Sequence, residues 1–319
     1  MRIDDKKQKI ADRRKINSEE MNDKKLTLRR NEIHIRDPFV FVKNGKYYLM
    51  GTTGEDPWGK GSDLVLYESE NLEKFNRACT MVTDGSLNGY SNIWAPELHK
   101  YNGKYYLIVS AFRKDIGRGC FIFESERLDD GFKMLTGKYV TPKHWECLDA
   151  TLFVYRNEPY LCFSNEWLAP VRGNGDGSLF IAKLSRDLKE LAEEPKIVVS
   201  GKECPLAVEI GDKIKGYVAE GPYLYEENGK IVLLWSTFTE RGYSVLKSVS
   251  ETGVYGEYVL KETVFDKDGG HCMSFIDLNG ERKIAFHQPN ETPEERMQIY
   301  PELQQNNRQY QGDTCIQRR

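Results

Sequence analysis

Residues 37–50 read DPFVFVKNGKYYLM and give the clearest indication of the fold. An extended apolar run ends at Lys43, the pair Asn44-Gly45 follows, and a second run rich in Tyr and Leu begins at Lys46. Asn-Gly between two such runs is the strongest short signal for a β-hairpin, because a type I′ turn requires positive φ at both central residues. The stretch therefore predicts two antiparallel strands joined by a two-residue turn.

The same pattern recurs four more times along the chain. Residues 95–108 read APELHKYNGKYYLI, and weaker copies lie at residues 149–161, 220–234 and 270–286. The turn asparagines are 51 to 71 residues apart; they are Asn44, Asn102, Asn157, Asn228 and Asn279. A repeat of about 50 residues with several strands per unit is typical of a β-propeller. We predict an all-β fold, a five-bladed β-propeller in which residues 31–319 form a single domain. Residues 1–30, dense in charge, are predicted to be a helical or disordered arm.

Composition narrows the class of protein. Of the 319 residues, 39% are hydrophobic and 30% are charged, which excludes a disordered chain. The apolar runs are only a handful of residues long, so we expect no transmembrane helix and no membrane partner. The net charge of −3 argues against a nucleic-acid partner.

The N-terminus and the cysteines predict a cytoplasmic protein. No apolar stretch follows the first charged residues, so they do not resemble a secretory signal peptide. The seven cysteines are odd in number and include no Cys-x-x-Cys pair, which favours free thiols in a reducing compartment. A chain from which a signal peptide had been removed would begin in the same way. The oligomeric state is not predicted.

The starts of the inner strands bring several acids together. The first strand of each blade lies nearest the propeller axis, so these starts converge at one mouth of the channel. Asp37 lies seven residues before its turn asparagine, whereas Asp149, Glu220 and His271 each lie eight before theirs. Trp94 begins the corresponding strand of the second blade. Crowded carboxylates raise one another's pKa and are more often functional than structural. The set predicts either a metal site or a sugar site.

Three acids suit the hydrolysis of a glycosidic bond. One carboxyl must be protonated to donate to the leaving oxygen, and another must be ionised to activate water or attack the sugar. A third acid nearby can keep the pKa of the donor raised. We therefore predict an enzyme that acts on an oligosaccharide and needs no organic cofactor.

Five short motifs, in this order, resemble glycoside hydrolase family 43. They are RDPFV (36–40), WAPEL (94–98), LDATL (148–152), EGPY (220–223) and GGH (269–271). The resemblance extends from about residue 33 over nearly the whole chain. It implies a catalytic five-bladed propeller that cleaves pentose and related glycosidic bonds with inversion. It also implies that Asp37 is the general base, Glu220 the general acid, and Asp149 the third carboxylate.

The resemblance implies further binding residues. In many family members a channel histidine, here His271, lies close to a calcium ion. Calcium prefers oxygen ligands, so we expect His271 to reach the ion through water or to orient other groups. The alternative is a hydrogen-bonded histidine with no metal. Trp94 resembles the substrate platform of the family, and we predict that Trp58 and Trp167 also bind substrate.

The expected substrate carries α-L-arabinofuranosyl linkages, as in arabino-oligosaccharides or arabinoxylan fragments, cut in exo or endo fashion. Family members active as β-xylosidases commonly carry an additional C-terminal β-sandwich, which the chain is not expected to contain. Other readings are a β-xylosidase or galactofuranosidase-like enzyme on the same fold and a non-catalytic carbohydrate-binding propeller. A phosphorylase would need a basic site, for which the candidates are Arg113, Arg118 and Arg241.

Overall fold

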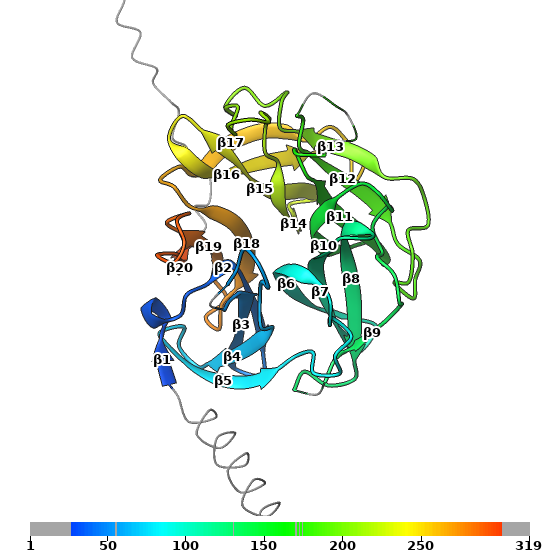
Figure 1. The fold of residues 1–319 in the computed structure, drawn as a ribbon. Helices are drawn as coiled ribbons and strands as arrows, with labels where there is room; N and C mark the ends of the chain where they lie inside the picture. Colours follow the sequence, from blue (N-terminus) through cyan, green and yellow to red (C-terminus); the bar gives the residue numbers. More distant parts are fainter. Residues whose placement is uncertain are drawn as a thin grey trace, which may run out of the picture.

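The computed structural model describes residues 27–301 except Glu55, Asp130, Pro170, Arg172 and Asn174. These residues form five antiparallel sheets arranged around a central axis (Figure 1). The predicted five-bladed β-propeller is therefore confirmed. Most of the predicted N-terminal arm, residues 1–26, lies outside the described residues. Within the described part of the chain, no helix is long and apolar enough to cross a lipid bilayer.

Each blade is built from consecutive strands. The first contains β2 (Arg36–Lys43), β3 (Lys46–Thr52), β4 (Val65–Ser69), β5 (Lys74–Thr80) and β1 (Thr27–Arg29). The second contains β6 (Ser91–Tyr101), β7 (Lys104–Arg113), β8 (Gly117–Ser125) and β9 (Lys133–Met134). The third contains β10 (Cys147–Tyr155), β11 (Glu158–Asn165), β12 (Ser178–Lys183) and β13 (Lys196–Ser200). The fourth contains β14 (Glu220–Glu227), β15 (Lys230–Thr239), β16 (Gly242–Ser250) and β17 (Val259–Phe265). The fifth contains β18 (Gly270–Ile276), β19 (Arg282–Gln288) and β20 (Arg296–Pro301).

Residues 27–29 fall within the predicted arm, yet they form β1 and pair with β5 at the outer edge of the first blade. A short 3-10 turn, η1 (Arg30–Glu32), then leads the chain inward to β2.

The predicted hairpin turns are present in four blades. Both central residues have positive φ at Asn44-Gly45, Asn102-Gly103, Asn228-Gly229 and Arg156-Asn157. The turn of the third blade therefore begins one residue before the asparagine predicted to start it. The fifth hairpin instead has a longer loop, in which Asp277 Oδ1 accepts the N–H groups of Asn279 and Glu281, each at 2.9 Å.

Apolar side chains fill the spaces between neighbouring blades. One cluster joins the first, second and fifth blades, and three more join the second to the third, the third to the fourth and the fourth to the fifth. Leu233 in the third of these clusters is fully buried, and its replacement by Ala should cost ~2–5 kcal/mol of stability. This packing fixes the inner strands relative to one another.

The first and fifth blades close the ring without sharing a strand within the described residues. Side chains make the junction instead. The Arg36 guanidinium donates to the backbone oxygen of Asn290 at 3.0 Å and to its Oδ1 at 2.6 Å. The hydroxyl of Tyr47 accepts the N–H of Leu278 at 3.0 Å. Ring closure thus brings β2 and β19, 250 residues apart at Asp37 and His287, into direct contact.

Candidate functional site

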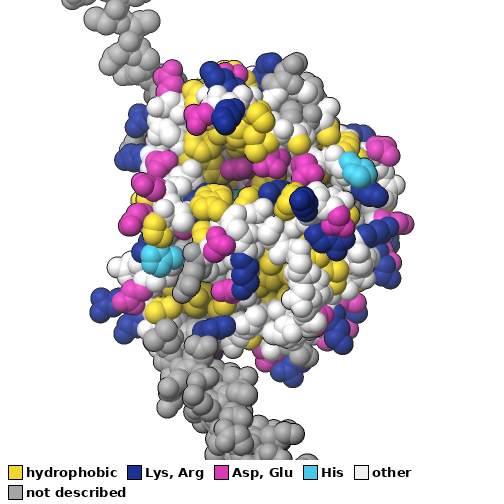
Figure 2. Space-filling model, in the orientation of Figure 1, with side chains coloured by type: hydrophobic (Ala, Val, Ile, Leu, Met, Phe, Trp, Pro, Cys, Tyr) yellow, Lys and Arg dark blue, Asp and Glu magenta, His cyan; other side chains and the backbone are white. Residues whose placement is uncertain are grey.

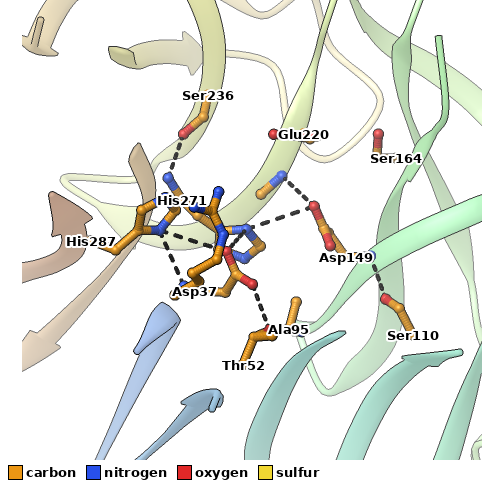
Figure 3. A network of polar contacts seen from close by, with 12 residues as sticks. Asp37, Thr52, Ala95, Ser110, Asp149, Ser164, Glu220, Ser236, His271 and His287 are labelled. Carbon is orange, nitrogen blue, oxygen red and sulfur yellow. Dashed lines mark hydrogen bonds and ion pairs between the residues drawn. The ribbon is translucent and has the colours of Figure 1, made fainter. Parts of the chain in front are cut away.

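Each inner strand contains a β-bulge at the same place, where its pairing with the second strand shifts. The residue at the bulge has positive φ in all five blades; these residues are Asp37, Ala95, Asp149, Gly221 and His271. Bulges redirect side chains, and strained backbone in non-glycine residues often marks functional positions. Here the bulges bring Asp37, Asp149 and His271 together at one end of the channel (Figure 3).

Glu220 does not occupy the position equivalent to Asp149, which corrects the alignment predicted from sequence. It pairs with Ser236, and Gly221 lies at the bulge. Counting back from the turn asparagines aligned Glu220 with Asp149 wrongly, because the turn of the third blade begins at Arg156, one residue before Asn157. Glu220, one residue before the bulge of β14, nevertheless lines the same cavity as Asp37 and Asp149.

The second strand of each blade supplies a polar side chain to the next blade (Figure 3). These residues are Thr52, Ser110, Ser164, Ser236 and His287, each paired with the residue before the bulge of its own blade. Four of them accept a backbone N–H of the next blade: Thr52 from Ala95 (2.8 Å), Ser110 from Asp149 (2.8 Å), Ser236 from His271 (2.8 Å) and His287 from Asp37 (3.1 Å). Ser164 instead donates its hydroxyl to the backbone oxygen of Ala219 at 2.6 Å. None of them was predicted to be part of the site. The sequence does carry a signal, since a hydroxyl residue recurs at this point in four largely apolar strands.

Asp37 lies among groups that favour its ionised form. Thr52 donates its hydroxyl to Asp37 Oδ2 at 2.6 Å, and His271 Nδ1 lies 3.2 Å from Oδ1. Burial by itself would raise the pKa of Asp37, but the positive charges of His271 and Arg36, together with the hydrogen bond from Thr52, lower it below its usual value. Asp37 is therefore a carboxylate that can accept a proton.

His287, at the junction of the first and fifth blades, is neutral. Burial, assisted by the nearby Arg36 charge, lowers the pKa of His287 to about 3. Its Nδ1 accepts the N–H of Asp37, so its proton lies on Nε2, which faces Asn290 Oδ1 at 3.1 Å. His287 thus fixes the backbone of Asp37 and acts as an acceptor there.

His271 lies between two carboxylates. Its Nδ1 is 3.2 Å from Asp37 Oδ1 and 3.7 Å from Asp149 Oδ2. Burial tends to lower the pKa of His271, but the charges of Asp37, Asp149 and Glu220 outweigh it and raise the pKa. The imidazolium form therefore stabilises the negative charge at the centre of the cluster.

Asp149 and Glu220 both have a raised pKa. Burial is the main cause for each, and for Asp149 the negative charges of Glu220 and Asp37 add to it, giving a pKa of about 7. The N–H of Gly221 donates to Asp149 Oδ2 at 3.1 Å, and Tyr243 donates its hydroxyl to Glu220 Oε1 at 2.7 Å. These bonds and His271 only partly offset the rise in pKa. The pair can therefore hold a proton near neutral pH.

These side chains border a small cavity of about 80 Å³. Its lining residues are Arg36, Asp37, Thr52, Pro57, Trp58, Trp94, Leu148, Asp149, Glu220 and His271. Figure 2 shows acidic side chains in a hollow near the middle of this face, with hydrophobic side chains beside it. A larger open groove of about 1340 Å³ lies along the first blade, and none of the clustered carboxylates lines it.

Two tryptophans form an aromatic corner at this cavity. Trp58 and Trp94 meet edge to face with ring centroids 5.8 Å apart, and Trp94 Nε1 donates to the backbone oxygen of Pro57 at 2.6 Å. Arg36 lies 4.9 Å from the centre of the Trp58 ring, and Arg118 lies 4.1 Å from that of Trp94. Trp58 is 57% exposed, so much of its surface is free to contact a ligand.

Trp167, the third tryptophan predicted to bind substrate, is elsewhere. Among the described residues, it is not part of the cavity lining, and its indole packs against Gly211 and Gly216 in the connection before β14. Two arginines suggested for a phosphate site, Arg113 and Arg241, pair with the carboxylates of neighbouring loops.

The polar side chains around His271 bond mainly to one another. His271 directs Nδ1 toward Asp37 and Asp149, whose carboxylates are already engaged by His271 and by backbone or hydroxyl donors. In the part of the chain that the structure describes, no cluster of three or more His, Cys, Asp or Glu side chains is placed to hold a metal ion. Calcium near His271 stays a prediction.

Chemically, the cavity combines a carboxylate whose pKa is lowered with a pair of carboxyl groups whose pKa is raised. Pairs of acids whose environments move their pKa values apart are the arrangement needed for acid and base roles in one reaction. The aromatic corner adds a surface on which the apolar face of a sugar can stack. The geometry therefore suits general acid–base attack of water on a glycosidic bond.

Comparison with known proteins agrees with this chemistry. The sequence model of "Glycosyl hydrolases family 43" matches residues 32–318. An extracellular exo-α-(1→5)-L-arabinofuranosidase of Streptomyces chartreusis is 28% identical over 66% of this chain and 62% of its own length. The chain thus spans less than two thirds of that relative.

Two solved structures show the same fold. An endo-arabinase from Bacteroides thetaiotaomicron superposes with a TM-score of 0.77 at 30% identity, over 88% of this chain and 98% of its own. A GH43 β-xylosidase/α-arabinofuranosidase from a compost microbial metagenome has a TM-score of 0.65 at 18% identity, over 85% and 92% of the two chains. The latter was described in a calcium-free form with xylotriose.

Proposed function

Because the chain belongs to glycoside hydrolase family 43, we propose that it hydrolyses α-L-arabinofuranosyl linkages with inversion. Its substrates are arabino-oligosaccharides or arabinoxylan fragments. The observation that carries the proposal is the opposite pKa shift of two carboxyl groups at one cavity: the pKa of Asp37 is lowered and that of Glu220 is raised.

Asp37 is the proposed general base. Its ionised carboxylate takes a proton from water as the water oxygen bonds to the anomeric carbon. Thr52 and His271 fix the two oxygens of this carboxylate, and the N–H of Asp37 is held by His287. Attack from the face opposite the leaving group inverts the configuration.

Glu220 is the proposed general acid. It donates its proton to the glycosidic oxygen while the bond from that oxygen to the anomeric carbon breaks. Asp149 is the proposed third carboxylate. Its negative charge disfavours ionisation of Glu220 and so helps to keep the pKa of Glu220 raised. The Gly221 N–H holds Asp149 in place.

The choice of arabinose rests on relatives and on the shape of the site. The relative from Streptomyces chartreusis and the structure from Bacteroides thetaiotaomicron both carry arabinan-related names. The cavity of about 80 Å³ favours a single terminal sugar, and the corner of Trp58 and Trp94 offers its apolar face a platform. A β-xylosidase is the second candidate, because the metagenome structure of the same fold carries both activities in its name. A cytoplasmic location stays a prediction from the N-terminus and the cysteines.

The first experiment is hydrolysis of 4-nitrophenyl glycosides and of arabino- and xylo-oligosaccharides. Asp37→Asn is the inactive variant, and Asp115→Asn, which changes an exposed carboxylate paired with Arg113, is the matched control. We expect arabinose release that only Asp37→Asn removes, with β-L-arabinofuranose seen first by ¹H NMR. Release of xylose instead would show that the substrate is a xyloside and not an arabinofuranoside. First release of the α-anomer would contradict inversion. No hydrolysis, together with binding of the same sugars, would favour a carbohydrate-binding propeller.

A further inference from the structure

Tyr243 reaches the cavity from an unexpected place. It lies at the start of β16, the third strand of the fourth blade, whereas Asp37, Asp149, Glu220 and His271 all lie on first strands. Its side chain is only 2% exposed, and its hydroxyl donates to Glu220 Oε1 at 2.7 Å. A third-strand side chain therefore touches the proposed acid.

The space for this side chain comes from a glycine of the next blade. A Cβ atom on Gly270 would overlap the Tyr243 ring, so only glycine leaves room for the ring at this point. His287 stacks on the ring at a centroid distance of 5.7 Å and an angle of 26°, and Phe238 lies 5.0 Å away. Three neighbours thus fix the direction of the Tyr243 hydroxyl.

We propose that Tyr243 is a positioning residue that determines which oxygen of Glu220 carries the transferable proton. The inference rests on the proposed function. In a neutral carboxyl group the carbonyl oxygen is the better acceptor, so a donor fixed at Oε1 leaves the acidic proton on Oε2. Among the described residues, Glu220 Oε2 has no hydrogen-bond partner, and this atom is not fully buried. Glu220 lines the cavity. The proton is therefore held on the oxygen that a substrate can reach.

The proton balance of the step follows directly. The proton on Glu220 Oε2 moves to the glycosidic oxygen as the bond from that oxygen to the anomeric carbon breaks, and Asp37 gains the proton of the attacking water. Tyr243 keeps its own proton, because burial raises its pKa well above the usual value and the Glu220 charge adds to this. It orients the acid and takes no part in the transfer.

Removing the Tyr243 hydroxyl should raise the pKa of Glu220 and lower the reaction rate. The groups that act on Glu220 are Asp37, Asp149, His271, Arg36 and Tyr243. The hydrogen bond from Tyr243 stabilises the carboxylate, so its loss raises the pKa of Glu220 further. The high-pH limb of kcat/KM, which reports loss of the acid proton, should then move to higher pH while the rate falls.

The test is Tyr243→Phe, with Tyr258→Phe as the matched control. Tyr258 is another buried tyrosine of the fourth blade whose hydroxyl donates to a backbone oxygen, that of Val254 at 3.1 Å. For Tyr243→Phe we expect kcat on an arabino-oligosaccharide to fall about tenfold. The loss should be smaller on an activated aryl arabinofuranoside, and the high-pH limb should move upward. Gly270→Ala, which displaces the ring, should show the same limb shift.

Each outcome bears on the proposal. An unmoved pH limb with equal losses on both substrates would overturn it, as would an equal limb shift in Tyr258→Phe. A wild-type chain that hydrolyses no glycoside would overturn the proposed function and this inference together. A wild-type chain that is active, with a Tyr243→Phe variant that behaves identically, would overturn this inference alone.

Discussion

Asp37 and Glu220 share one cavity, but their surroundings differ in kind. Asp37 lies against a hydroxyl donor and the imidazole of His271, and the positive charges of His271 and Arg36 lower its pKa. Glu220 has one donor among the residues that the structure describes, Tyr243, and burial raises its pKa. The pKa values of two carboxyl groups in the same site are thus shifted in opposite directions by their surroundings.

The difference follows from the position of the ring junction. Asp37 lies where the first and fifth blades meet, and there the second-strand residue is His287 instead of the Ser or Thr found in the other four blades. Arg36 and Asn290 also belong to this junction. The closing interface therefore supplies the groups that surround the base, whereas the acid lies on a strand between regular blades.

Replacement of the base should have the largest effect. We expect Asp37→Asn to lower kcat/KM by about 10²–10⁴-fold on oligosaccharides and aryl glycosides alike, because water must be activated whatever group leaves. Steady-state kinetics on both substrates would measure this. A much smaller loss on either substrate would mean that Asp37 does not activate the water.

Replacement of the acid should separate the two substrates. Glu220→Gln should lower kcat/KM on oligosaccharides by about 10²–10⁴-fold, but much less on a 4-nitrophenyl glycoside, whose leaving group needs little protonation. The variant should also lose the high-pH limb of the wild-type profile, since Gln cannot titrate. Equal losses on both substrates, in a protein shown to be folded by circular dichroism, would remove Glu220 from the acid role.

Weakening the neighbourhood of Asp37 should have a moderate effect. In Thr52→Val the carboxylate loses a donor that lowers its pKa, so the pKa of Asp37 rises and the low-pH limb of kcat/KM moves to higher pH. The same change leaves the Ala95 N–H without its acceptor, which costs ~1–3 kcal/mol of stability. At neutral pH Asp37 is still ionised, so we expect only about a tenfold loss of activity there.

Ser164→Ala is the matched control for that prediction. Ser164 holds the equivalent position in the third blade, but it donates to the backbone oxygen of Ala219 and to no carboxylate. Urea unfolding should show a stability loss in both variants, whereas only Thr52→Val should move the low-pH limb. A shift in both would mean that the limb reports loosening of the ring and not the bond to Asp37.

Local sequence was sufficient to predict the blades and the presence of Asp37, Asp149, Glu220 and His271 at one cavity. Each Asn-Gly turn is determined by two adjacent residues, and the turns of the first, second and fourth blades lie where the sequence put them. The bulges repeat at one point of each inner strand, so Asp37, Asp149 and His271 could be brought together by counting. Glu220 also lines the cavity, although the count placed it one residue away from its actual position relative to the bulge.

Contacts between blades were not predictable in the same way. Tyr243 meets Glu220 only because Gly270, 27 residues later, leaves space for its ring. His287 meets Asp37 only because the ring closes. Both depend on how complete sheets pack, which no window of adjacent residues records. The hydroxyl residue that recurs in the second strands is visible in the sequence, but only the pairing of the first and second strands shows that it bonds to the next blade.

The tryptophans offer the smallest and sharpest test of the site's extent. Trp58 borders the cavity beside Asp37 and is exposed, so Trp58→Ala should raise KM several-fold with little change in kcat, because stacking on a sugar is lost in ground state and transition state alike. Trp167 packs on Gly211 and Gly216 away from the cavity lining, so Trp167→Ala should lower the unfolding free energy and leave KM within about twofold. If Trp167→Ala raised KM as much as Trp58→Ala, the bound substrate would extend past the cavity to the connection before β14. The site would then recognise a longer stretch of chain than a terminal sugar.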